Sequence, residues 1–180
     1  MGENVGIMRF NETAMAFGLF QVVFADVIDH LAVATFRLRE RSETGLVFED
    51  VFGQESKRLL KQFRAELNRF DCRSDVSDEV RELRESCEII SRLRVWRNDR
   101  IHARIRMTEG GYALYDWRTR CRLDISCKEI ETNIELAVKA IVTLEANVQY
   151  LFRELNWDEE FEELFSTVPA LSEPPTSDEK

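Results

Sequence analysis

The residues best suited to chemistry lie close together in residues 91–106, which read SRLRVWRNDRIHARIR. This segment contains Arg97, Asn98 and His102. Near neutral pH an imidazole can take or give a proton. A guanidinium can hold an anion with two parallel hydrogen bonds and stabilise negative charge that develops on it. These three residues are therefore the candidate functional site.

The element that must position them is a helix predicted from Asp78 to about Arg106 or Met107. One stripe of this helix follows three-and-four spacing and contains Val80, Leu83, Cys87, Ile90, Arg94, Arg97, Ile101 and Ile105. In a helix of this length, Asn98 and His102 would lie side by side on one edge of the stripe. Arginines in a core stripe conflict with the local pattern, and such conflicts mark functional sites. The alternative is structural, with the arginines extending from the end of the stripe into water.

A second apolar stripe lies on the opposite side of the same predicted helix. It contains Ile89, Leu93, Trp96 and Ala103. A helix that is apolar on two sides is expected to pack on both sides, against its own bundle and against another subunit. This pattern predicts a homodimer built around the third helix.

Charge is distributed unevenly along a chain of 180 residues with a net charge of −9. The overall charge argues against nonspecific coating of nucleic acid. Residues 91–122, however, contain nine arginines and only three acidic residues, Asp99, Glu109 and Asp116. A local basic patch on an acidic protein indicates recognition of one anion-bearing partner, unless acidic neighbours simply balance a solvated face.

The remaining pattern predicts an all-α fold, an antiparallel bundle of four to five helices. Helices are expected over about 12–39, 54–70, 78–107 and 127–155, with a small β-hairpin insertion near 112–125. Ser126 with Glu129 forms a capping box before the fourth helix. A short acidic helix is expected over 157–165, and residues 1–10 are expected to be a loose lead-in. We expect one domain over 1–166 and a disordered, acidic, proline-containing tail over 167–180.

Several other chemistries are not indicated by the sequence. Cys87 sits in the apolar stripe and is expected to be a buried thiol, and the cysteine spacing fits a cytoplasmic protein without a zinc site. The charge-free stretch Ala14–Ala25 is too short to span a membrane. Asp26 and His30 are four residues apart, a spacing more typical of a surface contact than of a metal site. No metal or cofactor is expected.

The stretch Arg97-Asn98-Asp99-Arg100-Ile101-His102 resembles the motif of the HEPN (higher eukaryotes and prokaryotes nucleotide-binding) family. HEPN domains are helical bundles that carry an arginine followed a few residues later by a histidine, often with a polar residue directly after the arginine. Here four residues separate Arg97 from His102, and Asn98 fills the polar position. The resemblance covers roughly residues 12–155, mostly as architecture.

The resemblance implies a metal-independent endoribonuclease in which two such motifs meet across a homodimer interface. Arg97, His102 and Asn98 would be catalytic, and four nearby arginines would bind RNA: Arg94, Arg100, Arg104 and Arg106. Many relatives act as toxins or in antiphage defence, some beside an antitoxin partner. The alternative is a non-catalytic helical module that binds RNA, a nucleotide or another protein.

Overall fold

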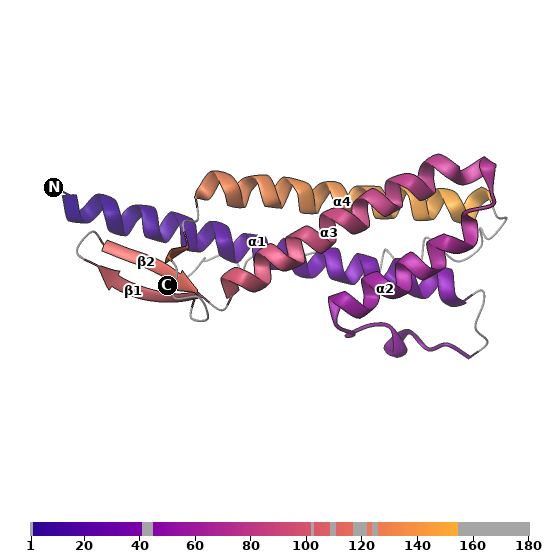
Figure 1. Cartoon of the computed structure of the whole chain (residues 1–180), viewed down its shortest axis with the longest axis horizontal. Coiled ribbons are helices and arrows are strands. Elements are labelled where there is room, and N and C mark those ends of the chain that lie inside the picture. Colours follow the sequence, from indigo (N-terminus) through magenta and orange to yellow (C-terminus); the bar gives the residue numbers. More distant parts are fainter. Residues whose placement is uncertain are drawn as a thin grey trace, which may run out of the picture.

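Four long helices make up most of the protein and pack as an elongated bundle (Figure 1). The computed structural model describes the backbone of residues 2–40, 45–101, 103–108, 111–116, 122–123 and 126–154, and the side chains of 12–40, 45–101, 115–116 and 126–154. The helices are α1 (Gly2–Glu40), α2 (Ser56–Leu67), α3 (Ser77–Ile101) and α4 (Cys127–Glu154). The predicted all-α bundle is confirmed. The short helix expected over 157–165 and the tail over 167–180 lie outside the described residues.

The starts of α3 and α4 follow from their capping sequences. Asp78 and Glu79 occupy the first turn of α3, where carboxylates interact favourably with the positive end of the helix. At the start of α4 the backbone N–H of Glu129 donates to Oγ of Ser126 at 3.1 Å. Both helices therefore begin within a residue of the predicted position. In contrast, α1 begins at Gly2, so the expectation of a loose lead-in over 1–10 was wrong.

The helices do not simply alternate in direction around the bundle, because α1 and α4 run parallel. The Thr13 hydroxyl lies 3.3 Å from Sγ of Cys127, and His30 Nε2 lies 2.8 Å from Oε1 of Glu145. Residue numbers rise together in these two contacts, so α1 and α4 run parallel. After α1 the connector runs back along the bundle before α2 begins, which lets α2 follow the direction of α1 (Figure 1). Only α3 runs against the other three helices.

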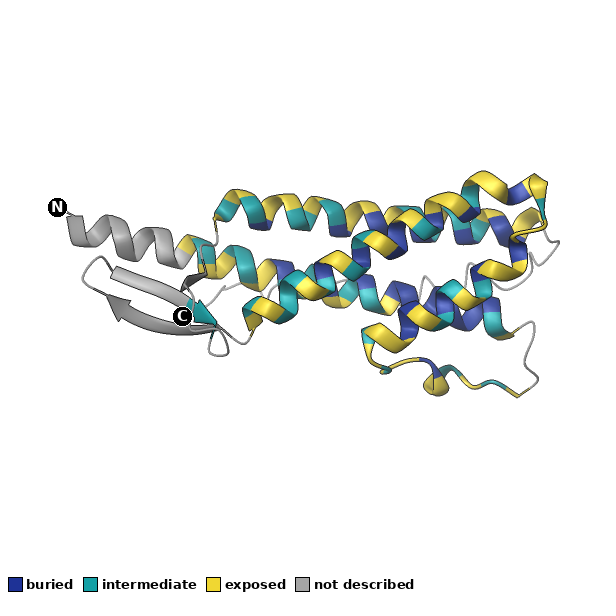
Figure 2. Ribbon diagram, viewed as in Figure 1, coloured by how far each residue is buried: buried dark blue, intermediate teal, exposed yellow. Residues whose placement is uncertain are grey.

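The core lies where the apolar stripes of the four helices meet (Figure 2). Large side chains from every helix are fully buried there, including Phe20, Leu31, Phe63, Leu83, Ile90, Leu144 and Leu151. Cys87 is also fully buried, as predicted, and burial raises the pKa of its thiol to about 11. The three-and-four spacing that predicted α3 and α4 thus marks the residues that build the core.

The end of α3 differs from the position that the sequence predicts. The helix was expected to reach Arg106 or Met107, but it ends at Ile101, and strand β1 (Ala103–Thr108) follows. It pairs antiparallel with β2 (Gly111–Asp116), which pairs with β3 (Arg122–Leu123). The predicted hairpin insertion therefore exists but starts earlier than 112. Residues 103–108 alternate arginine or threonine with apolar residues, a period-2 pattern that favours a strand, and Thr108 pairs with Gly111 across a short, glycine-containing connection.

His30 joins α1 to α4 at one edge of the bundle. Its side chain is 8% exposed, with Nδ1 2.8 Å from the carbonyl oxygen of Asp26 and Nε2 2.8 Å from the carboxylate of Glu145. Asp26 and His30 thus take part in packing between helices and not only in a surface contact. No cluster of three or more His, Cys, Asp or Glu side chains suited to a metal ion occurs among the described residues.

By length and composition alone, α1 could cross a membrane. The region Glu12–Glu40 reaches a mean hydropathy of 1.6 over its most apolar window, of which 39% is buried inside the protein. The apolar region is therefore longer than the charge-free stretch 14–25. A core helix of a soluble bundle passes the same test, so this finding is weak evidence for a membrane location.

Replacing Asp29 by asparagine is expected to stabilise the protein slightly at neutral pH. Partial burial, together with the carboxylate of Asp26, raises the pKa of Asp29. An ionised Asp29 therefore disfavours the folded state above that raised pKa, and the penalty disappears as the pH falls through it. Asp29→Asn should raise the free energy of unfolding by less than about 1 kcal/mol at pH 7, because the side chain is exposed to solvent.

Urea denaturation at several pH values measures this effect. The gain should vanish in acid. Glu85→Gln, at an exposed position on α3, should show no comparable gain. A stabilisation by Asp29→Asn that grows as the pH falls would contradict the assigned cause.

Candidate functional site

The polar end of the α3 stripe lies where the contact between α2 and α3 ends. Arg64 of α2 donates to the carboxylate of Glu88 at 2.8 Å, and Arg84 of α3 donates to Asn68 at 3.1 Å, just after α2. These antiparallel contacts lie in the first half of α3. With 12 residues against 25, α2 is about half as long as α3. In this antiparallel register the first residue of α2 falls level with about Trp96, so only the last turn of α3 extends past α2.

Burial along the stripe decreases toward the end of α3. Ile90 is fully buried, Arg94 and Arg97 are half-buried, and Ile101 is 43% exposed. Polar side chains are tolerated in the stripe because this part of it borders solvent. We call Arg94, Arg97 and Asn98, all half-buried, the Arg97 edge.

Arg97 is held in place by α1. Its Nε donates to Oε1 of Gln21 at 2.6 Å, and its guanidinium lies 5.6 Å from the centre of the Phe24 ring. One terminal nitrogen, Nη1, makes a long contact of 3.5 Å with Oδ1 of Asn98. Among the described residues, Arg97 bonds only to neutral amide oxygens. Among these residues its positive charge is therefore oriented without an acidic partner, which suits the binding of an anion.

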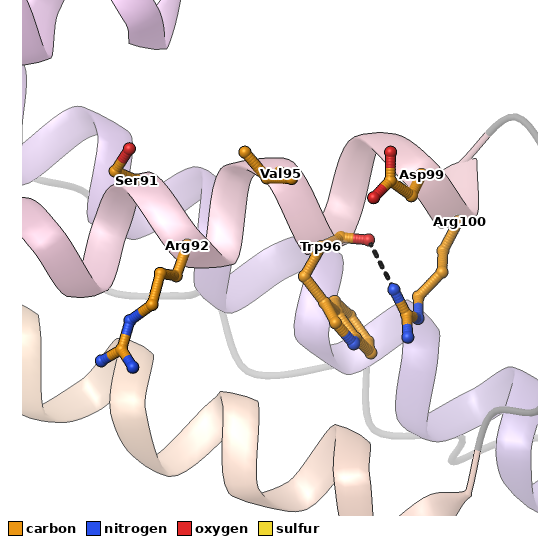
Figure 3. A pocket seen from close by; sticks show the side chains of 6 residues that line it. All are labelled: Ser91, Arg92, Val95, Trp96, Asp99 and Arg100. Atoms are coloured by element: carbon orange, nitrogen blue, oxygen red, sulfur yellow. Dashed lines mark hydrogen bonds between the residues drawn. The ribbon is translucent and has the colours of Figure 1, made fainter.

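Arg100 lies apart from the Arg97 edge, in a cluster with Trp96 and Glu129. Oε1 of Glu129 accepts hydrogen bonds from Trp96 Nε1 at 2.6 Å and from Arg100 Nη2 at 2.8 Å. The guanidinium of Arg100 lies 4.2 Å from the centre of the Trp96 ring, and Nη1 donates to the Trp96 carbonyl at 3.2 Å (Figure 3). Arg100 was expected to bind RNA, but in the structure it already pairs with the carboxylate of Glu129.

A shallow pocket of about 380 Å³ lies on the outer face of α3, beside this cluster (Figure 3). Its lining consists of Ser91, Arg92, Val95, Trp96, Asp99 and Arg100. Arg97 and Asn98 do not line it, because they point to another side of the helix. The pocket and the Arg97 edge are thus two separate features of α3.

The structure does not bring the whole predicted site together. His102 lies outside the described residues, directly after the last residue of α3. Arg104 and Arg106 were expected on α3, but their backbones belong to β1, where they pair with Tyr115 and Ala113. Within the described residues, α3 therefore carries Arg97 and Asn98 and ends at Ile101.

The second apolar stripe of α3 is used inside the protein. Leu93 is buried, and the Trp96 ring packs against Phe17 and Phe20 of α1 at centroid distances of 5.9 and 4.8 Å. Leu93 and Trp96 therefore pack against the protein's own bundle, which leaves less of this stripe for a subunit interface.

Sequence reasoning missed Gln21 and Glu129. Gln21 is one polar residue on a long apolar helix, and no local pattern links it to Arg97. The capping box assigned the Glu129 side chain to the start of α4, whereas its carboxylate bonds across to α3. The capping pattern thus predicted the contact of the Glu129 backbone with Ser126, but not the contacts of the Glu129 carboxylate with α3.

No family model matches the chain, and no curated protein or solved structure shows significant similarity to it. The resemblance to HEPN domains therefore rests on the Arg97–His102 motif and on the helical architecture.

Replacing Glu129 by glutamine is expected to lower the free energy of unfolding by about 1 kcal/mol. The amide keeps an acceptor oxygen for Trp96 but loses the charge that pairs with Arg100, and the carboxylate is 37% exposed, so solvent screens part of the loss. Urea denaturation measures the change. Glu131→Gln, at an exposed position two residues later, should have an effect below about 0.5 kcal/mol. Equal effects of the two substitutions would mean that the cluster adds nothing to stability.

Proposed function

We propose that this protein is a metal-independent endoribonuclease of the HEPN type. The observation that carries the proposal is Arg97, which Gln21 orients at a half-buried edge of the bundle without neutralising its charge. Asn98 lies beside it. In the sequence His102 follows four residues after this pair at the end of α3, as in the HEPN motif.

In the proposed reaction the substrate supplies the nucleophile. His102 takes the proton from an RNA 2′-hydroxyl, whose oxygen forms a bond to the adjacent phosphorus while the bond from phosphorus to the 5′-oxygen breaks. A protonated imidazole then gives a proton to the departing 5′-oxygen. Arg97 stabilises the negative charge that builds up on the phosphate oxygens. The products are a 2′,3′-cyclic phosphate and a 5′-hydroxyl, and Asn98 orients the phosphate or the imidazole.

The proposal also covers the oligomeric state, the cellular location and the partners of the protein. A composite cleft requires a homodimer, with RNA bound by Arg94 and by the arginines of residues 100–106. The protein would act in the cytoplasm as a toxin or in antiphage defence, with an antitoxin or another protein as regulator. The active enzyme is expected to be a homodimer, and light scattering should give twice the mass of one chain.

A second candidate function is a non-catalytic module that binds RNA or a nucleotide through the Arg97 edge. The end of α3 at Ile101 favours it, because the helix that holds Arg97 and Asn98 does not continue into residues 103–108, which form a strand. Arg97 can bind a phosphate in either case.

Cleavage of a mixed RNA pool by the purified protein in EDTA tests the proposal. Endonuclease cleavage with 2′,3′-cyclic phosphate ends supports it. RNA binding that depends on Arg97, without cleavage, supports the non-catalytic module instead.

A further inference from the structure

The outer side of the α1–α4 pair carries an exposed apolar surface along the line where the two helices meet. Five large apolar side chains form it: Met15, Leu19 and Val22 of α1 and Val138 and Val142 of α4. Their exposed fractions range from 46% for Val138 to 77% for Met15. These residues make up half of the large apolar side chains that are exposed in the described part of the chain. We call this surface the outer groove.

The parallel arrangement of α1 and α4 places the two sets of side chains along one line. Leu19 lies three turns before His30, and Val138 lies two turns before Glu145, each on the same helix face as the later residue. His30 and Glu145 touch at this edge of the bundle, 2.8 Å apart. Leu19 and Val138 therefore lie on the same side of the helix pair, with Val138 about one turn further along. Met15 and Val22 extend this surface along α1, and Val142 extends it along α4.

The rim of the outer groove is acidic. Exposed or half-exposed carboxylates from both helices border it: Glu12, Asp26, Asp29, Glu131, Glu135 and Glu145. Lys128 and Lys139 are the exposed lysines of α4. The raised pKa of Asp29, caused by partial burial and by Asp26, is consistent with carboxylates that crowd one another here.

The acidic rim determines which kind of partner can bind to the outer groove. A second copy docked through the same groove would place two acidic rims against each other, which like-charge repulsion opposes. The segment 154–180 of this chain carries nine acidic residues against one lysine, so the rim repels it as well. RNA and anionic membranes are disfavoured for the same reason.

We propose that the outer groove binds an amphipathic helix of another protein, with an apolar stripe flanked by lysine or arginine. The apolar stripe would cover the five exposed side chains, as in other helix-in-groove complexes. Basic flanks would pair with the acidic rim and set the orientation of the bound helix. The proposal does not depend on RNA cleavage, because it uses a different surface from the Arg97 edge.

Fluorescence anisotropy with a labelled helical peptide tests the proposal on the full chain. The peptide carries a leucine stripe with lysine flanks, and two controls have the same length: one with glutamate in place of lysine and one with the lysine sequence scrambled. The lysine peptide should bind with a Kd on the order of micromolar. Both controls should bind at least about tenfold more weakly.

Protein variants locate the binding surface. Leu19→Asp with Val138→Asp should weaken binding of the lysine peptide by at least about tenfold. Val95→Asp changes a similarly exposed valine on α3, outside the groove, and should leave binding unchanged. Glu131→Lys with Glu135→Lys should weaken binding of the lysine peptide and strengthen binding of the glutamate peptide. Melting temperatures of all variants should stay close to that of the wild type, because the substituted side chains are exposed.

Three results would overturn the proposal. One is equal binding of the scrambled and striped lysine peptides, which would reduce the effect to net charge. Another is no binding of the lysine peptide, or binding that Val95→Asp weakens as much as the groove variants do. The third is self-association of the wild type that Leu19→Asp with Val138→Asp abolishes, which would assign the groove to a second copy of the chain.

Discussion

Replacing His102 by alanine is expected to lower the rate of RNA cleavage by about 10²–10⁴-fold, the usual contribution of a general acid or base. His30, the other histidine of the chain, is held between α1 and α4 by the Asp26 carbonyl and the Glu145 carboxylate, so we expect no second imidazole to replace His102. The melting temperature of the His102→Ala variant should stay close to that of the wild type, because α3 ends at Ile101, before the substituted residue. Rates come from initial cleavage of a defined RNA in EDTA, and stability from thermal denaturation of the same samples.

Changes at Arg97 complete this test. Arg97→Ala should reduce cleavage by a similar order, because the lost charge acts most strongly on the transition state. Arg97→Lys should restore only part of the rate, because an ammonium cannot form two parallel bonds to phosphate. Arg97→Ala should also cost about 1 kcal/mol of stability through the lost bond to Gln21.

The matched control is Arg81→Ala, which removes an exposed arginine near the start of α3 that pairs with Asp78. It should cleave like the wild type. DNA should not be cut, because it lacks the 2′-hydroxyl, and chelators should have no effect. Wild-type activity in His102→Ala would exclude the proposed mechanism. Loss of activity in Arg81→Ala as large as in Arg97→Ala would mean that overall charge, and not the Arg97 edge, governs the reaction.

Replacing Phe20 by alanine is expected to lower the free energy of unfolding by about 3–5 kcal/mol, the range for a buried phenylalanine. Phe20 is fully buried and contacts the rings of Phe17, Phe24 and Trp96 at 6.2, 5.8 and 4.8 Å. Truncation leaves a cavity where α1 meets α3, which the surrounding rings fill only in part. For a domain of this size each kcal/mol corresponds to roughly 2–4 °C in melting temperature.

The control for Phe20 is Phe52→Ala. Phe52 is 43% exposed and stacks on Phe48 at 4.9 Å in the connector before α2. Its loss should cost about 1 kcal/mol or less. Urea denaturation of both variants gives the comparison. Equal losses would show that the aromatic cluster around Trp96 is not the centre of the α1–α3 contact.

The sequence by itself determined that four helices form and which of their apolar stripes fill the core, but not where α1 begins or where α3 ends. Val80, Leu83, Cys87 and Ile90 are buried as the three-and-four spacing predicted, because an amphipathic helix buries its apolar stripe wherever it packs. Capping chemistry is equally local, since the Ser126 side chain bonds to a backbone N–H only three residues away. Such features depend on neighbours in the sequence and can be predicted without the fold.

Only the tertiary structure decided the features that depend on distant segments. Residues 102–107 continue a helical stripe and also alternate as a strand does, and pairing of β1 with β2 decides between the two periods. The parallel direction of α1 and α4 follows from the path of the connector, and it creates the outer groove. Gln21 orients Arg97 from 76 positions away, and Glu129 bonds across to Trp96 and Arg100. A local pattern cannot predict such contacts, because their partners meet only when the helices pack together.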